Sequence, residues 1–461
     1  MRAQTTQPTT TYMPPDEVFR QRLAARNRRG LFSRILFYAS VFTALLVLVI
    51  LFLNVLNETF GTVAVQYEIP PETLTTAVTS LDELEKGDLV AILDEHVGRR
   101  FRVILRNALS QVPDEQYTTA PLRDVFNGKI FPAELGNHVI GDLEQHQLAS
   151  ILQSNLSQSQ LRDLVMREVV VEEVVASWPL YDTLFNKDEI EAVTAEEYPE
   201  ATLRFKSWIN RDFLTTPMSS VPELAGIRTA ILGTVYVILI VLAVSLPLGV
   251  GAAIYLEEYA DDSRINRMIE TNIRNLAGVP SIIYGMLGLA IFVRLLAALT
   301  SGAVFGVEDS NGRTIVSAAL TLALLILPII IINAQEALRA VPSTLREASF
   351  GLGATQWQTI WHTVLPSAIP GILTGTILAV SRAIGETAPL IVVGASTFIV
   401  TDPDGPFSKF TVLPIQIFQW TSRPEAEFRD IAAAAIIVLL LLMLAMNATA
   451  IILRNRYSVR Y

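Results

Sequence analysis

The stretch VPSTLREASFGLGATQWQTIWHTVLPSAIPG, residues 341–371, separates two long apolar segments and decides how the chain is interpreted. Its pattern predicts two short helices around a glycine turn, with Gly351 and Gly353 at the bend. Glu347, Ala348 and Ser349 precede that bend on the first helix. Small residues beside a turn let the surface of another protein approach closely, so the stretch is a candidate docking element.

The second helix of this stretch carries two tryptophans. Trp357 and Trp361 are four residues apart and therefore share a helix face. Leu365 and Pro366 then end the element where the next apolar segment begins, because a residue before proline is biased away from the helical region. From the residues alone, two interpretations stay open: a surface that contacts a partner protein, or an interfacial helix anchored by tryptophan.

The apolar segments around this stretch indicate an α-helical multi-pass membrane protein. The 461-residue chain is 51% hydrophobic and only 17% charged, whereas soluble domains carry about 25% charged residues. Apolar runs long enough for a membrane span occupy roughly residues 229–256, 273–297, 314–337, 367–395 and 431–453. The chain has no cysteine, which excludes disulfides, thiolate nucleophiles and cysteine metal sites.

The N-terminal half adds a sixth span and a long acidic segment. We expect residues 1–34 to form a disordered, basic cytoplasmic tail and residues 35–56 to form the first transmembrane helix. Residues 57–225 should then form an extracytoplasmic soluble insert between the first two helices, of mixed α/β and mostly helical fold; they carry 28 acidic and 13 basic side chains. Residues 226–456 hold the transmembrane core, and residues 457–461 form a cytoplasmic tail. An acidic domain beside a basic membrane portion argues against nucleic-acid binding.

A charged pair lies inside one of the predicted spans. In SRAIGETAPL, residues 381–390, Arg382 and Glu386 are four residues apart, so we expect them to meet on one helix face. Charges at that depth are costly and usually functional. The planar guanidinium of Arg382 matches an oxyanion, and Glu386 would balance its charge. The alternative is an ion pair that only fixes helix packing.

The stretch 341–371 resembles the EAA loop of binding-protein-dependent ABC importer permeases, E-A-A-x3-G-x9-I-x-L-P. The matching positions are Glu347, Ala348, Ser349, Gly353, Leu365 and Pro366, with Ser349 at the second alanine and Thr363 at the isoleucine. In that family the loop is the coupling helix, which docks on the ATPase subunit. The resemblance therefore implies an ATPase-coupling role for these residues and a six-helix type I ABC importer permease fold.

Three further stretches resemble the PstA family, the permease subunits of bacterial phosphate importers. They are NLAGVPSIIYGMLGLAIFV (275–293), LPIIIINAQEALRAVPSTLREAS (327–349) and ILTGTILAVSRAIGETAPL (372–390). The resemblance covers about residues 213–456 and implies that the transported ion is inorganic phosphate, contacted by Arg382 and Glu386. The long insert departs from the shortest members of the family, and the resemblance gives it no function.

The resemblance also implies the partners and the location. We expect a PstC-like second permease subunit, PstB-like ATPase subunits that bind ATP and Mg²⁺, and a PstS-like extracytoplasmic phosphate-binding protein, assembled in the bacterial inner membrane. The chain itself has no Walker A loop, and we expect no catalytic residue, cofactor or metal in it. Two alternatives are a permease for another oxyanion, such as sulfate or molybdate, and a transmembrane sensor that uses the insert.

Overall fold

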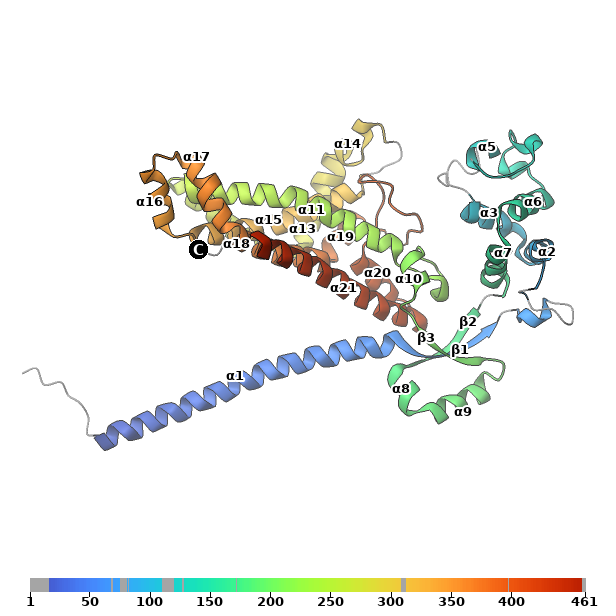
Figure 1. Ribbon diagram of the computed structural model, residues 1–461, viewed down its shortest axis with the longest axis horizontal. Helices are drawn as coiled ribbons and strands as arrows, with labels where there is room; N and C mark the ends of the chain where they lie inside the picture. Colours follow the sequence, from blue (N-terminus) through green and yellow to red (C-terminus); the bar gives the residue numbers. More distant parts are fainter. Residues whose placement is uncertain are drawn as a thin grey trace, which may run out of the picture. The chain divides into compact units, whose positions relative to one another are not determined.

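A computed structural model describes residues 16–67, 69–74, 81, 83–109, 120–126, 128–170, 172–307, 312–396 and 398–457. Contacts divide the chain into two units, Met1–Asn57 and Glu58–Tyr461. The described part of the first unit belongs to one long helix, α1 (Asp16–Thr59) (Figure 1). Within it, Ser33–Thr59 is long and apolar enough to cross a membrane.

The beginning of α1 corrects the predicted N-terminal tail. Residues 16–34, expected to be disordered with the rest of the tail, belong to the helix. Arginine, alanine and leucine, which favour helices, are frequent in this stretch, and the prolines of the N-terminus all come before it. Residues 1–15, and residues 458–461 of the predicted C-terminal tail, lie outside the described residues.

After α1 the chain enters a small antiparallel sheet without a linker. Its described strands are β1 (Phe60–Tyr67), β2 (Glu172–Pro179) and β3 (Thr202–Ser207), in the order β2-β1-β3. Tyr67 pairs with Glu172, so the segment between these two residues is inserted at the open end of the β1–β2 pair. We call residues 60–225 the inserted domain.

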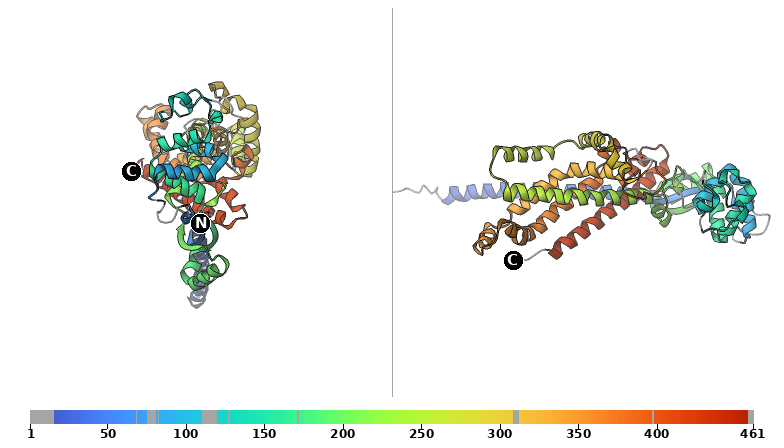
Figure 2. Two further views of the ribbon diagram at one scale, coloured as in Figure 1. Left: turned by 90° about the vertical axis from the view of Figure 1, so that its right-hand side faces the viewer. Right: turned by 90° about the horizontal axis from the view of Figure 1, so that it is seen from above.

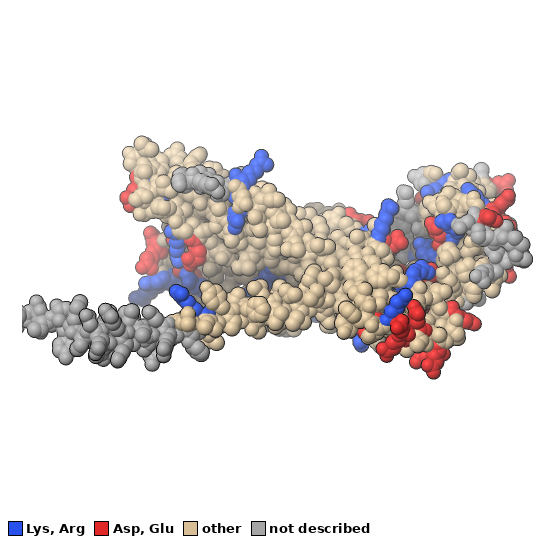
Figure 3. Space-filling model, turned by 60° about the horizontal axis from the view of Figure 1, so that its bottom comes forward, with Lys and Arg blue, Asp and Glu red and all other residues tan. Residues whose placement is uncertain are grey.

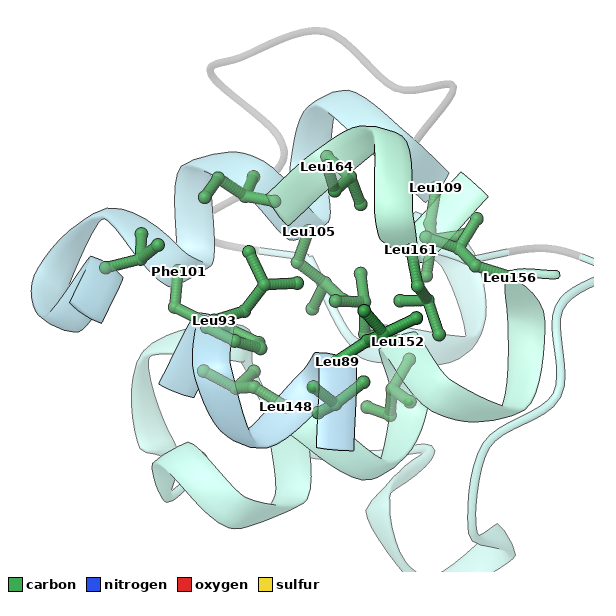
Figure 4. Close-up of a cluster of buried hydrophobic side chains, with 14 of the residues drawn as sticks. Leu89, Leu93, Phe101, Leu105, Leu109, Leu148, Leu152, Leu156, Leu161 and Leu164 are labelled. Carbon is green, nitrogen blue, oxygen red and sulfur yellow. The ribbon is translucent and has the colours of Figure 1, made fainter. Parts of the chain in front are cut away.

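The segment between β1 and β2 is helical and has its own core. Its helices include α2 (Lys86–Val97), α3 (Phe101–Leu109), α5 (Leu122–Val125), α6 (Gln145–Asn155) and α7 (Gln158–Val165). All five contribute leucines to one buried cluster, and Figure 4 shows several of them, among them Leu89, Leu105, Leu152 and Leu161. The described residues of the inserted domain thus combine a three-stranded sheet with several short helices.

One face of the sheet packs against the helices of the membrane core. Short helices α8 (Leu180–Phe185), α9 (Lys187–Glu197) and α10 (Arg211–Thr215) surround the last two strands. Val63 and Val65 of β1 share a buried cluster with Trp420 and Phe428. This cluster joins the inserted domain to the beginning of the last long helix.

The second unit continues with the helices of the membrane core. They are α11 (Arg228–Ile254), α12 (Arg264–Leu276), α13 (Ser281–Gly288), α14 (Ala297–Thr300), α15 (Ile315–Arg339), α16 (Ser343–Gly351), α17 (Gln356–Thr359), α18 (Leu365–Gly385), α19 (Ala388–Val393), α20 (Leu413–Thr421) and α21 (Ala426–Tyr457). In the described part of the chain, α1 and four of these elements are long and apolar enough to span a membrane, and a bent helix pair raises the number to six. The α16–α17 element and the C-terminal end of α21 lie at the same end of the core (Figures 1 and 2).

The bent pair corrects the predicted span 273–297. Helix α12 and the segment Ser281–Leu295 meet at 104°. The break falls at Gly278 and Pro280, because proline cannot continue the hydrogen bonding of the preceding helix. The second segment alone is about 22 Å long, shorter than the hydrocarbon core of a bilayer.

Candidate functional site: an uncovered helix face and an exposed coupling element

One face of α18 is left uncovered by the rest of the chain. Its exposed residues recur at helical spacing: Gly371, Thr374, Leu378, Arg382 and Gly385. We call these five residues the α18 stripe. In a membrane helix, a face that combines small, polar and charged residues suits a protein or aqueous surface better than lipid.

The charged pair lies at the end of this stripe. The Nε of Arg382 donates to Oε1 of Glu386 at 3.3 Å, and the two side chains are 45% and 19% exposed. The predicted ion pair is therefore present. The pair uses only the Nε of Arg382, so the exposed guanidinium still has N–H groups that could donate to an oxyanion.

The helical setting of this pair differs from the prediction. Helix α18 ends at Gly385, and Glu386 has an extended backbone (φ −80°, ψ 114°). Pro389 explains the break, since it has no N–H to donate to the carbonyl of Gly385. The expected continuous span 367–395 is thus two helices, α18 and α19, and Glu386 occupies the junction between them.

The edge of the α18 stripe that contains Gly371 is held close to α15 by glycine. A Cβ added to Gly375 would lie 2.3 Å from Cβ of Asn333, and one added to Gly371 would lie 2.7 Å from Cβ of Ala337. On another side, Oγ of Ser381 donates to Oδ1 of Asn447 in α21 at 2.9 Å. These contacts fix the rotation of α18 and therefore which residues form its uncovered stripe.

The coupling element, residues 341–366, folds as the sequence predicts. Helix α16 ends in a turn with Gly353 at φ +83°, a conformation that favours glycine. The hydroxyls of Ser349 and Thr359 are 2.8 Å apart and link the two helices across that turn. Thr355 caps α17 by accepting from the backbone N–H of Gln358.

The coupling element presents a broad surface. Glu347, Ala348 and Gly353 are exposed, and so are several large apolar side chains: Phe350 (48%), Leu352 (90%), Trp357 (58%) and Trp361 (52%). The two indole rings stack with centroids 5.4 Å apart. Exposed large apolar side chains grouped on one element are typical of a protein–protein or membrane contact.

The last two predicted coupling residues have a different environment. Leu365 and Pro366 are half-buried at the beginning of α18, and Leu365 packs against the cluster that contains Val364 and Ala368. They therefore set where α18 begins and are not part of the exposed surface. Ser349 is also half-buried, because its hydroxyl faces Thr359.

An ion pair that sequence reasoning missed holds the coupling element in place. The guanidinium of Arg346 donates to Glu258 at 2.7 Å and to the carbonyls of Val341 and Leu338 at 2.7 and 2.9 Å. Glu258 is only 10% exposed and lies in the π-helical turn Tyr255–Tyr259 that follows α11. The signal available in the sequence was the pair of glutamates, Glu257 and Glu258, directly after an apolar run.

A second bridge lies beside the first. Nε of Arg339, at the end of α15, donates to Glu257 at 2.7 Å, and the same guanidinium lies 3.7 Å from Glu270 of α12. Neighbouring glutamates thus connect the end of α11 to both α15 and α16. The coupling element is consequently linked through charged groups to the ends of α11 and α15, and through Arg339 to the shorter helix α12.

This chain belongs to the family of binding-protein-dependent transport system inner membrane components. The sequence model of that family matches residues 245–459. The α-helical, multi-pass permease fold predicted from the sequence is thereby confirmed, and the chain is a transport permease component rather than an enzyme. The match begins at residue 245, so the inserted domain lies outside it.

Individual relatives agree with the family. The phosphate transport system permease protein PstA of Yersinia pestis is 33% identical over 243 residues, which are 52% of this chain and 77% of the relative. A probable ABC transporter permease protein of Bacillus subtilis, YqgI, is 32% identical over 191 residues, 41% of this chain. The chain spans 60% of the length of YqgI.

A likeness to solved structures is also present. The bacterial ABC transporter involved in the import of the acidic polysaccharide alginate is 16% identical, with a TM-score of 0.39. The alignment covers 60% of this chain and 92% of the other.

Proposed function

We propose that this chain is a permease subunit of an ATP-driven importer of inorganic phosphate. The observation that carries the proposal is the 33% identity to a phosphate transport system permease protein over 77% of that protein's length. The family match, residues 245–459, includes α18, where an arginine is exposed on an otherwise apolar helix. An always-charged, planar donor is the side chain best suited to a tetrahedral oxyanion.

In this proposal Arg382 contacts the ion and Glu386 balances its charge. While no ion is present, the 3.3 Å pair lowers the cost of a guanidinium in the membrane. When phosphate enters, the guanidinium of Arg382 releases the carboxylate of Glu386 and binds the ion instead. Glu386 then accepts a hydrogen bond from a phosphate hydroxyl. Fully deprotonated sulfate has no hydrogen to donate, so the same pair favours phosphate.

The proposed partners follow from the surfaces that the chain leaves uncovered. The α18 stripe faces a PstC-like second permease subunit across the pathway. The exposed coupling element docks on PstB-like ATPase subunits, which bind ATP and Mg²⁺, and a PstS-like binding protein delivers phosphate. In this arrangement both termini are cytoplasmic, the inserted domain is extracytoplasmic, and the complex lies in the bacterial inner membrane.

Phosphate uptake by the Arg382→Gln variant tests the proposal. We expect uptake to fall about tenfold or more, because losing a charged hydrogen-bonding partner costs about 1.5–3 kcal/mol. Arg294→Gln is the matched control, since Arg294 is also an exposed arginine of a membrane segment but lies outside the α18 stripe. That variant should transport normally.

The alternatives give different results in the same assay. Competition by excess sulfate or molybdate, with weak competition by phosphate, would identify a permease for another oxyanion. Normal phosphate uptake by Arg382→Gln, in a complex that contains the variant at its usual level, would show that the ion pair only fixes helix packing.

A further inference from the structure

The short helix α8 of the inserted domain exposes an apolar face. Tyr181, Leu184 and Phe185 are spaced so that they share one side of the helix, and they are 60%, 66% and 70% exposed. The rings of Tyr181 and Phe185 lie 4.9 Å apart. We call these three residues the α8 patch.

Contacts on the opposite side hold α8 in a fixed orientation. The backbone N–H of Thr62, in β1, donates to Oγ1 of Thr183 at 2.8 Å. The hydroxyl of Thr183 in turn donates to the carbonyl of Pro179 at 3.0 Å. Thr183 is hydrogen-bonded to the sheet, and the α8 patch lies on the opposite side of the helix, so the patch points away from the sheet. The exposure of these side chains is therefore not caused by a loosely attached helix.

The α8 patch lies close to the level at which membrane segments end. Pro179, directly before α8, pairs with Gly61, which is two residues after the end of the candidate span Ser33–Thr59. Independently, Oγ of Ser177 donates to Oδ2 of Asp430 at 2.7 Å, within the first turns of the candidate span Ala426–Arg456. Leu180 follows Ser177 by three residues, a distance of about 10 Å along a strand.

We propose that the α8 patch inserts into the interfacial layer of the bilayer, at the boundary between headgroups and acyl chains. An interfacial helix buries its apolar face about 5–10 Å into the boundary between headgroups and acyl chains, and α8 begins within about 10 Å of Ser177, whose hydroxyl contacts the first turns of a candidate span. Tyrosine and phenylalanine are side chains that bilayer interfaces favour. Phe205 of β3 adds a further aromatic group, 58% exposed, in the row of the sheet that contains Thr62.

The charge around the patch selects the kind of lipid contact. Helix α9 follows α8 directly and exposes five acidic side chains: Asp188, Glu189, Glu191, Glu196 and Glu197. Acidic residues also gather over the inserted domain in Figure 3, on its right-hand side. These carboxylates repel anionic headgroups. The contact is therefore an apolar insertion and does not depend on anionic lipid.

The natural chain contains no cysteine, so single cysteine substitutions give unique labelling sites for a test. The full chain, assembled with its partner subunits in phosphatidylcholine nanodiscs, carries a spin label at Leu184→Cys. Ile130→Cys is the control, because Ile130 is a similarly exposed aliphatic residue of the inserted domain (68% against 66%) outside the α8 patch. Collisions with oxygen report lipid, and collisions with a water-soluble nickel complex report water.

We expect the label at Leu184 to collide more often with oxygen than with the nickel complex, and the label at Ile130 to show the reverse. Tyr181→Cys, on the same helix face, provides a second reporter that should behave like Leu184. Adding anionic lipid should leave the preference at Leu184 unchanged or weaken it.

Two results would overturn the inference. Equal access of the nickel complex to Leu184 and Ile130 would show a patch that faces water. A label at Leu184 shielded from both reagents would show that a protein partner covers the patch. Because the readout does not involve transport, it separates this inference from the phosphate proposal, which fails or holds by the uptake of Arg382→Gln.

Discussion

Two glycines of α18 have opposite surroundings although both lie in the same membrane helix. Gly375 meets Asn333 of α15, whereas no atom outside its own helical surroundings lies within 4 Å of a Cβ built on Gly385. A Cβ at Gly375 would therefore push α18 away from α15. One at Gly385 would project into open space beside Arg382.

This difference predicts a difference in stability. Gly375→Ala should lower the unfolding free energy of the purified chain by about 1–3 kcal/mol, the usual cost of overpacking a close contact. Gly385→Ala should change it little, and thermal melts in one detergent compare the two variants directly. Equal losses would indicate that α15 and α18 can move apart at no cost.

Among the elements, α16 and α17 depend on the bridge between Arg346 and Glu258. Arg346 is 21% exposed, so its removal leaves a nearly buried carboxylate without its charged partner. The π-helical turn that holds Glu258 widens the end of α11 and aims this carboxylate at α16. In the proposed complex, a rigid element at residues 341–366 would transmit movement of the docked ATPase into α11.

We therefore expect Arg346→Ala to lower phosphate uptake more strongly than ATP hydrolysis by the assembled complex. Combining Arg346→Glu with Glu258→Arg should restore part of the uptake, because the reversed charges can pair again. Arg267→Ala is the control, since Arg267 and Asp262 form an exposed pair, 64% and 83% exposed, with little energetic weight. Normal phosphate uptake by Arg346→Ala would show that the ion pair between Arg346 and Glu258 is not needed for coupling.

At the scale of the whole molecule, the inserted domain consists of two separately packed parts. The helical part has its own buried cluster, centred on residues such as Leu89 and Leu152, and the sheet contributes to another that includes Trp420. The chain leaves the sheet at Tyr67 and returns to it at Glu172, and these two residues are paired.

Replacing residues 68–171 by Asn-Gly should consequently leave the membrane core folded. Asn-Gly favours the two-residue turn that joins paired antiparallel strands. We expect the melting temperature of the shortened chain to stay within about 4 °C of the full chain, the shift that a 1 kcal/mol change produces. A large loss would show that the helical part supports the sheet.

The sequence predicts local features of this molecule better than its breaks and long-range contacts. The glycine turn at Gly353 and the pairing of Arg382 with Glu386 follow from residues close together in the chain. The break after Gly385 was missed because the sequence on both sides is apolar and the span 367–395 was predicted as one continuous helix. Similarly, the predicted span 273–297 included Pro280, so the break between α12 and α13 was missed.

The bridge between Arg346 and Glu258 could not be predicted, because 88 residues separate its partners and only tertiary packing brings them together. The α18 stripe was also hidden, since which face stays uncovered depends on the glycine contacts with α15. For the inserted domain, the pairing of β1 with two distant strands could not be read from the sequence.

The exposure of Leu352 affects how long the chain survives in the cell without its partners. Its side chain is 90% exposed at the tip of the coupling element, close in sequence to the exposed ring of Phe350. A subunit synthesised in excess of its partners would display this apolar tip to the surrounding solution, the kind of surface that chaperones and proteases recognise. We expect the half-life of the chain to depend on matched synthesis of the complex, with surplus copies degraded first.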